Sequence, residues 1–275
     1  MEIYYGSETE KAIKSFGKGQ TPSVLIKAYG EVKKAALMAQ QEYGRRYPED
    51  YFPILLQVCD EIISGMHDDQ FPLSLRQGGA GTSLHMNINE VIANMANSRY
   101  TGDFTADPLE DIACYQSTND TFPTAVVIVL YRFLSEAESK VTAFQEYLVK
   151  NEKKFDSILM TARTELQDAL PIKLGQVFAS WAGPVERDRW RLGKLKERIR
   201  NIALGGTAVG TCFSAPSAFV FISEKHLRAQ TGLPLCRSQN LTDAVSHHDS
   251  LSELAGGFSL VAGNLYKMSG DLLLY

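Results

Sequence analysis

The chain has 275 residues, with 28 basic and 32 acidic side chains and a formal net charge of −4 at pH 7. This mildly acidic balance gives no electrostatic attraction to nucleic acid or to an anionic membrane, so we expect neither as a partner. A hydrophobic fraction of 44% and a charged fraction of 22% are typical of a globular protein, and the length suggests about two domains.

The apolar runs and the cysteines predict where the protein resides. The longest uninterrupted apolar run, Ala125 to Tyr131, is far shorter than the roughly 20 residues that cross a bilayer. The first residues lack the basic start and the apolar run of a signal peptide. The cysteines form no CxxC pair, which predicts free thiols in a reducing compartment, and we therefore expect a cytoplasmic protein. They are Cys59, Cys114, Cys212 and Cys236.

Short helical patterns occupy the first part of the chain. Apolar residues recur at helical spacing at about 22–43, 49–65 and 88–97, so we expect three helices there. A short β-hairpin is expected near 70–76.

The first long helix is expected to begin near Asn119 and Asp120, which are favourable N-cap residues. Pro123 then lies in the first turn, where a missing N–H costs little. The apolar residues that follow recur every three or four positions, which predicts one buried stripe. They are Val126, Leu130, Phe133, Leu134, Ala137, Val141, Phe144 and Leu148.

Two further long patterns follow. One extends from about Leu174 to Leu204 and contains Gly183-Pro184, which should kink or break it. The other extends from Leu241 to the terminus and ends in an apolar period, Leu272 to Tyr275, without a cap.

Three long helices joined by glycine-rich or polar loops predict an all-α fold built around an elongated helical bundle. We expect a small N-terminal helical domain over 1–112 and a central long-helix domain over 113–275. Helices of about 30 residues are about 45 Å long, which favours bundling with other subunits.

Two polar segments precede helices and are candidates for chemistry. Gly78-Gly79-Ala80-Gly81-Thr82-Ser83 combines glycines, which allow a close approach to an anion, with two hydroxyl donors. It is not a P-loop, because no Gly-Lys-Ser/Thr follows. Gln116-Ser117-Thr118-Asn119-Asp120 lies before a helix N-terminus, whose partial positive charge suits a carboxylate. The structural alternatives are a simple turn for the first and simple capping for the second.

Two more polar segments lie further along the chain. Arg163 to Pro171 (RTELQDALP) also fits a solvated turn with an internal Arg–Asp pair. Leu204 to Thr211 (LGGTAVGT) follows a helical pattern and is typical of a helix stop.

In this order and spacing, the segments resemble the motifs of the aspartase/fumarase superfamily. Gly79 to Ala93 (GAGTSLHMNINEVIA) is similar to the first substrate loop of that superfamily and the helix after it. Gln116 to Thr124 (QSTNDTFPT) is similar to the second region, and Arg163 to Gln176 (RTELQDALPIKLGQ) to the segment that joins two bundle helices. Leu204 to Thr211 also matches, and the resemblance extends from Tyr5 to Leu274.

The resemblance implies a lyase that performs a reversible β-elimination on a dicarboxylate such as aspartate, fumarate or malate. A base removes a Cβ proton, an aci-carboxylate dianion forms and the Cα substituent leaves, while pre-placed donors stabilise the developing charge. The resemblance also implies a homotetramer in which loops of three subunits form each active site, and no cofactor. Carried over by position, the substrate-binding residues are Thr82, Ser83, Ser117, Thr118, Asn119, Thr164 and Glu165, with His85 as a further candidate.

Details of the motifs favour an aspartate ammonia-lyase, which forms fumarate and ammonia from L-aspartate. Fumarases more often have a Ser-Gly-Thr first loop and a double serine in the second region. A fumarase-like hydratase and a catalytically dead structural or regulatory homologue are the alternatives. Two residues depart from the pattern of the superfamily. Glu165 stands where that pattern usually has His or Gln, and His85 stands where it usually has Asn. Glu165 would repel a carboxylate or hold a substrate ammonium, and His85 would contact a ligand or pack internally.

The superfamily's flexible Gly-Ser-Ser loop, which carries the general base and a carboxylate-binding lysine, has no counterpart in this sequence. The catalytic base is therefore assigned to no residue, and we expect the chain alone to be inactive or impaired, without the C-terminal domain. A truncated chain, a split enzyme completed by a second chain and a natural pseudoenzyme are the alternatives. His247 and His248 are adjacent and form no HxxxH pair, so we expect no metal site.

Overall fold

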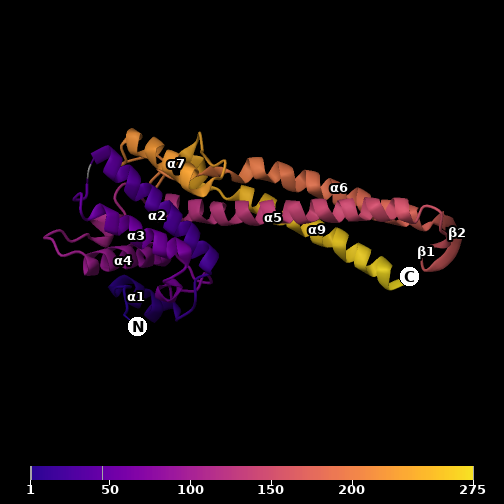
Figure 1. The fold of residues 1–275 in the computed structure, drawn as a ribbon, viewed down its shortest axis with the longest axis horizontal. Coiled ribbons are helices and arrows are strands. Elements are labelled where there is room, and N and C mark those ends of the chain that lie inside the picture. Colours follow the sequence, from indigo (N-terminus) through magenta and orange to yellow (C-terminus); the bar gives the residue numbers. More distant parts are fainter. Residues whose placement is uncertain (1, 45, 275) are drawn as a thin grey trace. The chain divides into compact units, whose positions relative to one another are not determined.

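The computed structural model describes residues 2–44 and 46–274, and most of them are helical, which confirms the all-α prediction (Figure 1). Two short antiparallel strands form a hairpin, and two two-residue strands pair in parallel. Tyr275, at the end of the third long pattern, lies outside the described residues. The helices are α1 (Ser7–Phe16), α2 (Ser23–Gly44), α3 (Phe52–Ser64), α4 (Thr82–Arg99), α5 (Thr118–Lys154), α6 (Leu174–Ile199), α7 (Ser217–Thr231), α8 (Leu241–Ser246) and α9 (Asp249–Leu274), with the short turns η1 (Asp68–Gln70) and η2 (Pro108–Ile112).

The contacts divide the chain into two compact units. The first unit comprises the residues up to Leu130 together with Arg200–His248, and the second comprises Tyr131–Ile199 and the residues from Asp249 onwards. Helix α5 therefore contributes its beginning to the first unit and its remainder to the second. The predicted domains are continuous in sequence and meet between residues 112 and 113, whereas each compact unit combines two separate segments. The domain boundary stays a prediction.

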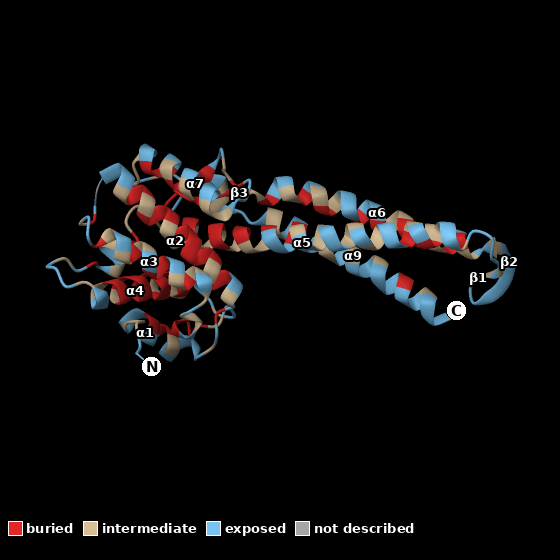
Figure 2. Ribbon diagram, in the orientation of Figure 1, coloured by how far each residue is buried: buried red, intermediate tan, exposed pale blue. Residues whose placement is uncertain are grey.

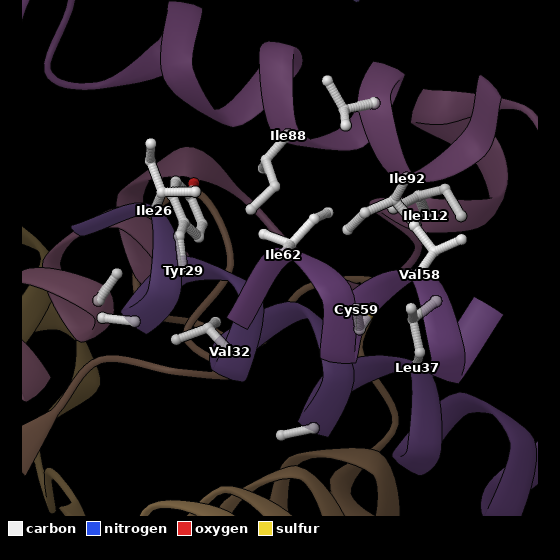
Figure 3. Packing of buried hydrophobic residues seen from close by; sticks show 14 of the residues in the cluster. Ile26, Tyr29, Val32, Leu37, Val58, Cys59, Ile62, Ile88, Ile92 and Ile112 are labelled. Carbon is white, nitrogen blue, oxygen red and sulfur yellow. The ribbon is translucent and has the colours of Figure 1, made fainter. Parts of the chain in front are cut away.

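The core of the first unit lies among α2, α3 and α4 (Figure 3). Residues at helical spacing on α2, such as Ile26 and Tyr29, meet Ile62 of α3 and Ile88 of α4, and each of the four is fully buried. Burying one such side chain stabilises a fold by about 1.5–3 kcal/mol. Helix α2 is buried on almost every side, because α7 also packs on it (Figure 2).

The sequence patterns did not predict α1. A buried carboxylate of α4 caps the N-terminus of this helix. Glu90 Oε2 accepts the N–H groups of Gly6 (2.9 Å) and Thr9 (3.1 Å), and Oε1 accepts that of Glu8 (2.8 Å). The first N–H groups of a helix have no partner within it, so an acidic side chain from elsewhere stabilises its start. Helix α1 thus depends on a residue more than 80 positions away.

The predicted hairpin near 70–76 is wrong. The segment holds η1 and an irregular stretch, because its backbone pairs with an earlier part of the chain. Gly19 N–H donates to the carbonyl of Pro72 (3.0 Å), and Thr21 N–H to that of Phe71 (3.1 Å). The hairpin occurs instead at β1 (Leu159–Thr164) and β2 (Gln167–Lys173), between α5 and α6.

The second unit contains the long helices. Leu148 of α5, Val177 and Trp181 of α6 and Met268 of α9 form its core. The predicted break at Gly183-Pro184 is wrong, because α6 continues through both residues. Pro184 removes one intrahelical hydrogen bond, but the buried neighbours on that face of α6 hold the helix together.

The ends of the other predicted helices differ in two places. Helix α6 ends at Ile199 rather than near Leu204, and β3 (Asn201–Ile202) then pairs with β4 (Cys236–Arg237). The pattern that begins at Leu241 divides into α8 and α9 around His247 and His248, which are both exposed. His247 pairs with Asp243 at 3.0 Å.

Candidate functional site

The N-terminus of α5 is the centre of the candidate site in the first unit. Ser117 precedes the helix, and its Oγ accepts the N–H of Asn119 at 3.2 Å. In return, Asp120 Oδ1 accepts the N–H of Ser117 at 2.9 Å, so the two side chains cap the start of the helix together. Thr118 and Asn119 therefore occupy the first helical turn, where the helix carries a partial positive charge.

Asp120 also fastens the glycine-rich segment to this helix end. Its Oδ2 accepts the N–H groups of Gly205 (3.2 Å) and Thr207 (2.9 Å). Gly205 has a φ of +88°, and a Cβ there would lie 2.5 Å from a side-chain atom of Val220. The segment Leu204 to Thr211 is thus not the stop of α6, as the sequence suggested, but a loop folded against the start of α5.

The charge of Asp120 is held in a fully buried position. Burial raises the pKa of this carboxyl to about 6, while the backbone N–H donors and the charge of Lys33 act in the opposite direction. The carboxyl is therefore ionised at neutral pH and needs every one of its donors.

A cleft of about 530 Å³ opens beside this helix end. Its size is within the range of small-molecule sites in proteins. Asn119 spans one side, since its Nδ2 donates to the carbonyl of Ala208 at 2.8 Å. The cleft is lined by Gln116, Ser117, Thr207, Ala208, Val209, Thr211, Phe213 and Ser214.

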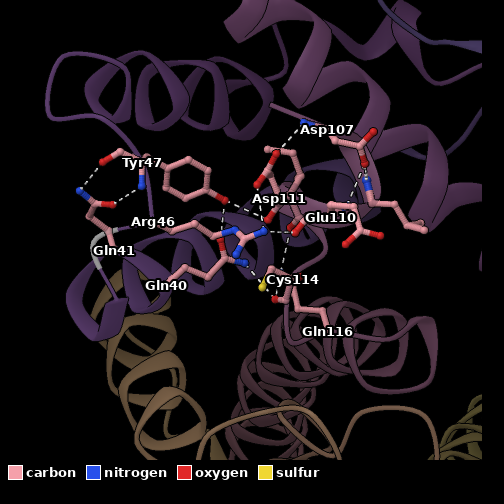
Figure 4. Close-up of polar contacts among 11 residues, drawn as sticks. Gln40, Gln41, Arg46, Tyr47, Asp107, Glu110, Asp111, Cys114 and Gln116 are labelled. Atoms are coloured by element: carbon pink, nitrogen blue, oxygen red, sulfur yellow. Dashed lines mark hydrogen bonds and ion pairs between the residues drawn. The ribbon is translucent and has the colours of Figure 1, made fainter. Parts of the chain in front are cut away.

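Polar contacts hold the segment that leads into the cleft (Figure 4). Gln40 Nε2 of α2 donates to the carbonyl of Cys114 at 2.9 Å, and Gln116 Nε2 donates to the carbonyl of Ile112 at 2.9 Å. Arg46 pairs with Asp111 at 2.9 Å. Ser117 is consequently presented from a backbone that α2 fixes on one side.

His85 of α4 lies against the same helix end. Its Nδ1 is 2.8 Å from Thr118 Oγ1, and its Nε2 is 2.8 Å from Lys33 Nζ. The ring stacks on Tyr29, with centroids 6.0 Å apart. Lys33 Nζ also donates to Gln116 Oε1 at 2.8 Å. Both ring nitrogens are thus engaged by protein groups, which favours internal packing of His85 over direct contact with a ligand.

Burial sets the charges of this pair. It lowers the pKa of Lys33 to about 7, although the charge of Asp120 acts to raise it. Burial also holds the pKa of His85 well below its ordinary value, and the neighbouring Lys33 charge adds to that effect. His85 is therefore neutral at physiological pH, whereas Lys33 loses its proton at a much lower pH than an exposed lysine does.

The first predicted loop leads into α4. Gly81 precedes the helix with a φ of +86°, and a Cβ on it would lie 2.4 Å from the ring of Phe122 on α5. The missing side chain thus lets the loop approach the beginning of α5. Thr82 is exposed and Ser83 half-buried in the first turn of α4.

Thr164 and Glu165 belong to the second unit, so the site described above does not include them. Both are exposed at the turn between β1 and β2, where Glu165 and Leu166 have φ of +48° and +62°. Arg163 pairs with Asp168 across the turn at 3.5 Å, as expected for a solvated turn with an internal pair.

Lys33 and the structural role of Asp120 were missed from the sequence. Lys33 lies on the buried face of α2, where the residues one helical turn away are apolar. A lysine at a core position of a helix is rare, and this placement could have marked Lys33 as a functional candidate. Asp120 was predicted to precede the helix as an N-cap residue, whereas it lies within the first turn of α5, and its bonds to Gly205 and Thr207 join residues distant in sequence.

Within residues 2–44 and 46–274, no helix has the length and apolar composition that a membrane span requires. Across the same described part of the chain, no group of three or more histidine, cysteine, aspartate and glutamate side chains is arranged to hold a metal ion. The described cysteines are free thiols.

Fold, motifs and family comparison together define the class. A family model described as "Lyase" matches residues 4–275, and the chain belongs to this lyase family, within the aspartase/fumarase superfamily. It is 37% identical over 276 residues to fumarate hydratase class II of Staphylococcus aureus (strain MRSA252). This alignment covers 98% of this chain and 59% of that protein. It is 36% identical over 281 residues to fumarate hydratase class II of Thermus aquaticus, with the same coverage of both. The chain therefore spans about three fifths of the length of these relatives.

Solved structures show the same fold. Cobalt-bound fumarate lyase:delta crystallin of Brucella melitensis matches 99% of this chain and 61% of its own, with a TM-score of 0.91 and 34% identity. The class II fumarase of Schistosoma mansoni also has a TM-score of 0.91, over 98% of this chain and 61% of its own, at 25% identity.

Proposed function

We propose that this chain forms the carboxylate-binding part of a fumarate hydratase-type lyase, which interconverts fumarate and malate by reversible addition of water. The observation that carries the proposal is the 37% identity to a class II fumarate hydratase over 98% of the chain. The motif details that favour loss of ammonia from L-aspartate carry less weight, because the two relatives reported above are both hydratases.

The geometry at α5 supports a carboxylate ligand. The helix N-terminus, the hydroxyls of Ser117 and Thr118 and the amide of Asn119 are neutral donors, so they bind an anion without titrating. We propose that Thr82 and Ser83, in the first turn of α4, add hydroxyls to the same ligand. In the reaction, these donors would stabilise the negative charge that develops on the substrate carboxylate.

Thr164 and Glu165 fit the proposal if copies of the chain assemble. We propose a homotetramer, in which the β1–β2 turn of one copy completes a site on another. Glu165 is exposed and would place a negative charge beside a dicarboxylate, so its role there would be to bind water or a proton rather than a carboxylate. Its substitution by glutamine is expected to change turnover more than dicarboxylate affinity.

The proton-abstracting base is proposed to come from a Gly-Ser-Ser loop outside this sequence. Addition of water to fumarate forms one C–O and one C–H bond, and the reverse elimination needs a base at Cβ. We propose that this chain binds the carboxylates and that turnover requires a second segment corresponding to the remaining length of the relatives.

Two measurements test the proposal. The first is titration of the 275-residue chain with succinate, a dicarboxylate that cannot react, followed by NMR of the α5 and α4 N-terminal amides. Saturable shifts there are expected in the wild type and should weaken at least tenfold in Thr118→Val, while Thr142→Val, in the second unit, serves as the matched control. Shifts confined to other regions would contradict the proposal.

The second measurement is turnover with the remaining two fifths of the Staphylococcus aureus relative supplied as a separate chain. The absorbance of the fumarate double bond is followed with L-malate and, separately, with L-aspartate. Appearance of fumarate from L-malate is expected. Fumarate from L-aspartate alone would replace the hydratase with an ammonia-lyase, and silence with both, despite a correctly assembled complex, would favour a catalytically dead homologue.

A further inference from the structure

Three buried or half-buried groups form one line behind the α5 N-terminus. Lys33 of α2, His85 of α4 and Thr118 of α5 are joined by two contacts of 2.8 Å each. Lys33 is fully buried and His85 is 5% exposed, so water has little access to the line. Thr118, half-buried at its end, is a substrate-binding residue in the proposed function.

The protons in this line have a defined order when Lys33 is charged. An ammonium group can only donate, so His85 Nε2 must accept from it. A neutral imidazole carries one proton, which then resides on Nδ1 and is donated to Thr118 Oγ1. Because the oxygen of Thr118 already accepts this bond, its own hydroxyl hydrogen is free to donate elsewhere.

We propose that Lys33 and His85 are positioning residues that fix the hydroxyl of Thr118 as a hydrogen-bond donor towards a substrate carboxylate. The proposal rests on the proposed function for the identity of the ligand, but not for the order of protons. An imidazole suits this place, since it connects Lys33 and Thr118 through two separate ring nitrogens.

The groups around Lys33 decide how the line responds to pH. Cys59 of α3 stays a neutral thiol, because burial raises its pKa to about 12. Burial also raises the pKa of Tyr29, the ring against His85, so that it stays neutral. Gln116 does not titrate. The charged neighbour is Asp120 of α5, which gains its proton only near pH 6.

Loss of the Lys33 proton removes the constraint on the line. Burial lowers the pKa of Lys33 to about 7, so the ammonium becomes an amine just above neutral pH. An amine has a lone pair, so His85 Nε2–H can donate to it while Nδ1 accepts from the Thr118 hydroxyl. That reversal moves the ring proton from Nδ1 to Nε2 and takes the hydroxyl hydrogen away from the ligand, and the positive charge is lost as well.

Nitrogen-15 NMR of the imidazoles tests the order of protons directly. The His85 signals are assigned by their loss in His85→Phe, which retains a ring against Tyr29. Near pH 6 the wild type is expected to show the Nδ1–H tautomer, and Thr118→Val should alter the Nδ1 signal whereas Thr118→Ser should preserve it. An Nε2–H tautomer near pH 6 would overturn the proposal, whether or not any ligand binds.

Succinate affinity as a function of pH tests the consequence. In the wild type, the dissociation constant is expected to rise about tenfold from pH 6 to pH 8, as one nearby positive charge is lost. Lys33→Met should bind weakly and lose most of this pH dependence, leaving the smaller part that comes from ionisation of Asp120, and Thr118→Ser should retain the full dependence. An unchanged pH dependence in folded Lys33→Met would overturn the proposal, as would a flat profile in the wild type.

The two proposals fail in different ways. Absence of succinate binding together with the Nδ1–H tautomer would refute the carboxylate site, and with it the positioning of Thr118 towards a ligand, while the proton order would stand. Succinate binding together with the opposite tautomer would refute the positioning role and leave the proposed function intact.

Discussion

The two compact units of this chain place their side chains under different constraints. In the first, α2 is surrounded by α3 and α7 and buries charged as well as apolar residues, including Lys33. In the second, α9 buries Leu254, Gly257 and Met268, whereas Tyr266 is 84% exposed. The first unit therefore encloses α2 within its own core, whereas the second leaves apolar surface on long helices.

The difference also separates the two sets of predicted site residues. Ser117 and Thr118 are held by hydrogen bonds to neighbouring elements, so their geometry is defined within one chain. Thr164 is exposed where β1 meets the turn, and it pairs with Gln167 of the adjoining strand. The proposed function combines two kinds of site. One is preorganised on packed helices, and the other is an exposed turn that would contribute to a site on another copy of the chain.

The largest effect is expected from the core of the first unit. Ile62→Ala removes a fully buried side chain of α3 and should lower the free energy of unfolding by about 3–5 kcal/mol, because the surrounding helices cannot collapse into the cavity. Met268→Ala, in the thinner core of the second unit, should cost about 2 kcal/mol. Urea unfolding with hydrogen exchange resolved for each unit measures both, and equal losses would remove the distinction between the two interiors.

The next effect compares one buried carboxylate from each unit, Asp120 and Asp188. Asp120→Ala leaves three backbone N–H groups without an acceptor and should cost about 3 kcal/mol. Asp188→Ala should cost about 1–2 kcal/mol, because two side chains, Asn264 and the 39% exposed Arg191, lose an acceptor and water can replace the bond to Arg191. Amide exchange at Gly205 and Thr207 is expected to accelerate only in the first variant. Equal protection in both would contradict the anchoring role of Asp120.

The pH dependence of stability probes the buried pair. The pKa of Lys33 is lowered to about 7 in the folded state, so between about pH 7 and 10 the unfolded chain binds more protons and stability rises with pH. The slope from Lys33 should be about 1 kcal/mol per pH unit near pH 8. The pKa of Asp120 is raised to about 6, so its contribution falls as pH rises from about 4 to 6. In chemical unfolding, the free energy of unfolding of Lys33→Met should no longer rise between about pH 7 and 10. If the rise persists in this variant, another group causes it.

The smallest effect on stability is expected at the surface of the second unit. Tyr266→Lys should change the unfolding free energy by less than about 0.5 kcal/mol, since the side chain is 84% exposed. It should nevertheless weaken self-association, which sedimentation velocity measures, because a charge is placed on an apolar helix face. Val24→Lys on α2, 45% exposed, is the control and should leave association unchanged. Association insensitive to Tyr266→Lys would exclude this face of α9 from the proposed tetramer.

The helices were predictable because their evidence is local. Apolar residues at three- and four-residue spacing indicated α2 and α5. The predicted start of α5 is displaced, because the helix begins at Thr118, so Asn119 and Asp120 are not its N-cap and Pro123 lies inside the helix beyond the first turn. The capping chemistry of Ser117 and Asp120 is local too. These features depend on backbone hydrogen bonds and side-chain periodicity within one segment, so they can be recognised without knowledge of what packs against them.

Other features depended on contacts between distant segments. Helix α1 starts on Glu90, and the expected hairpin near 70–76 is replaced by pairing with Gly19 and Thr21. Lys33 and His85 are 52 positions apart, and Asp120 and Thr207 are 87 apart. Their pKa values and proton order follow from burial and from partners that only the packed fold supplies. Local spacing therefore predicted which residues form helices and loops, whereas the charge and hydrogen-bond direction at the site arose from long-range packing.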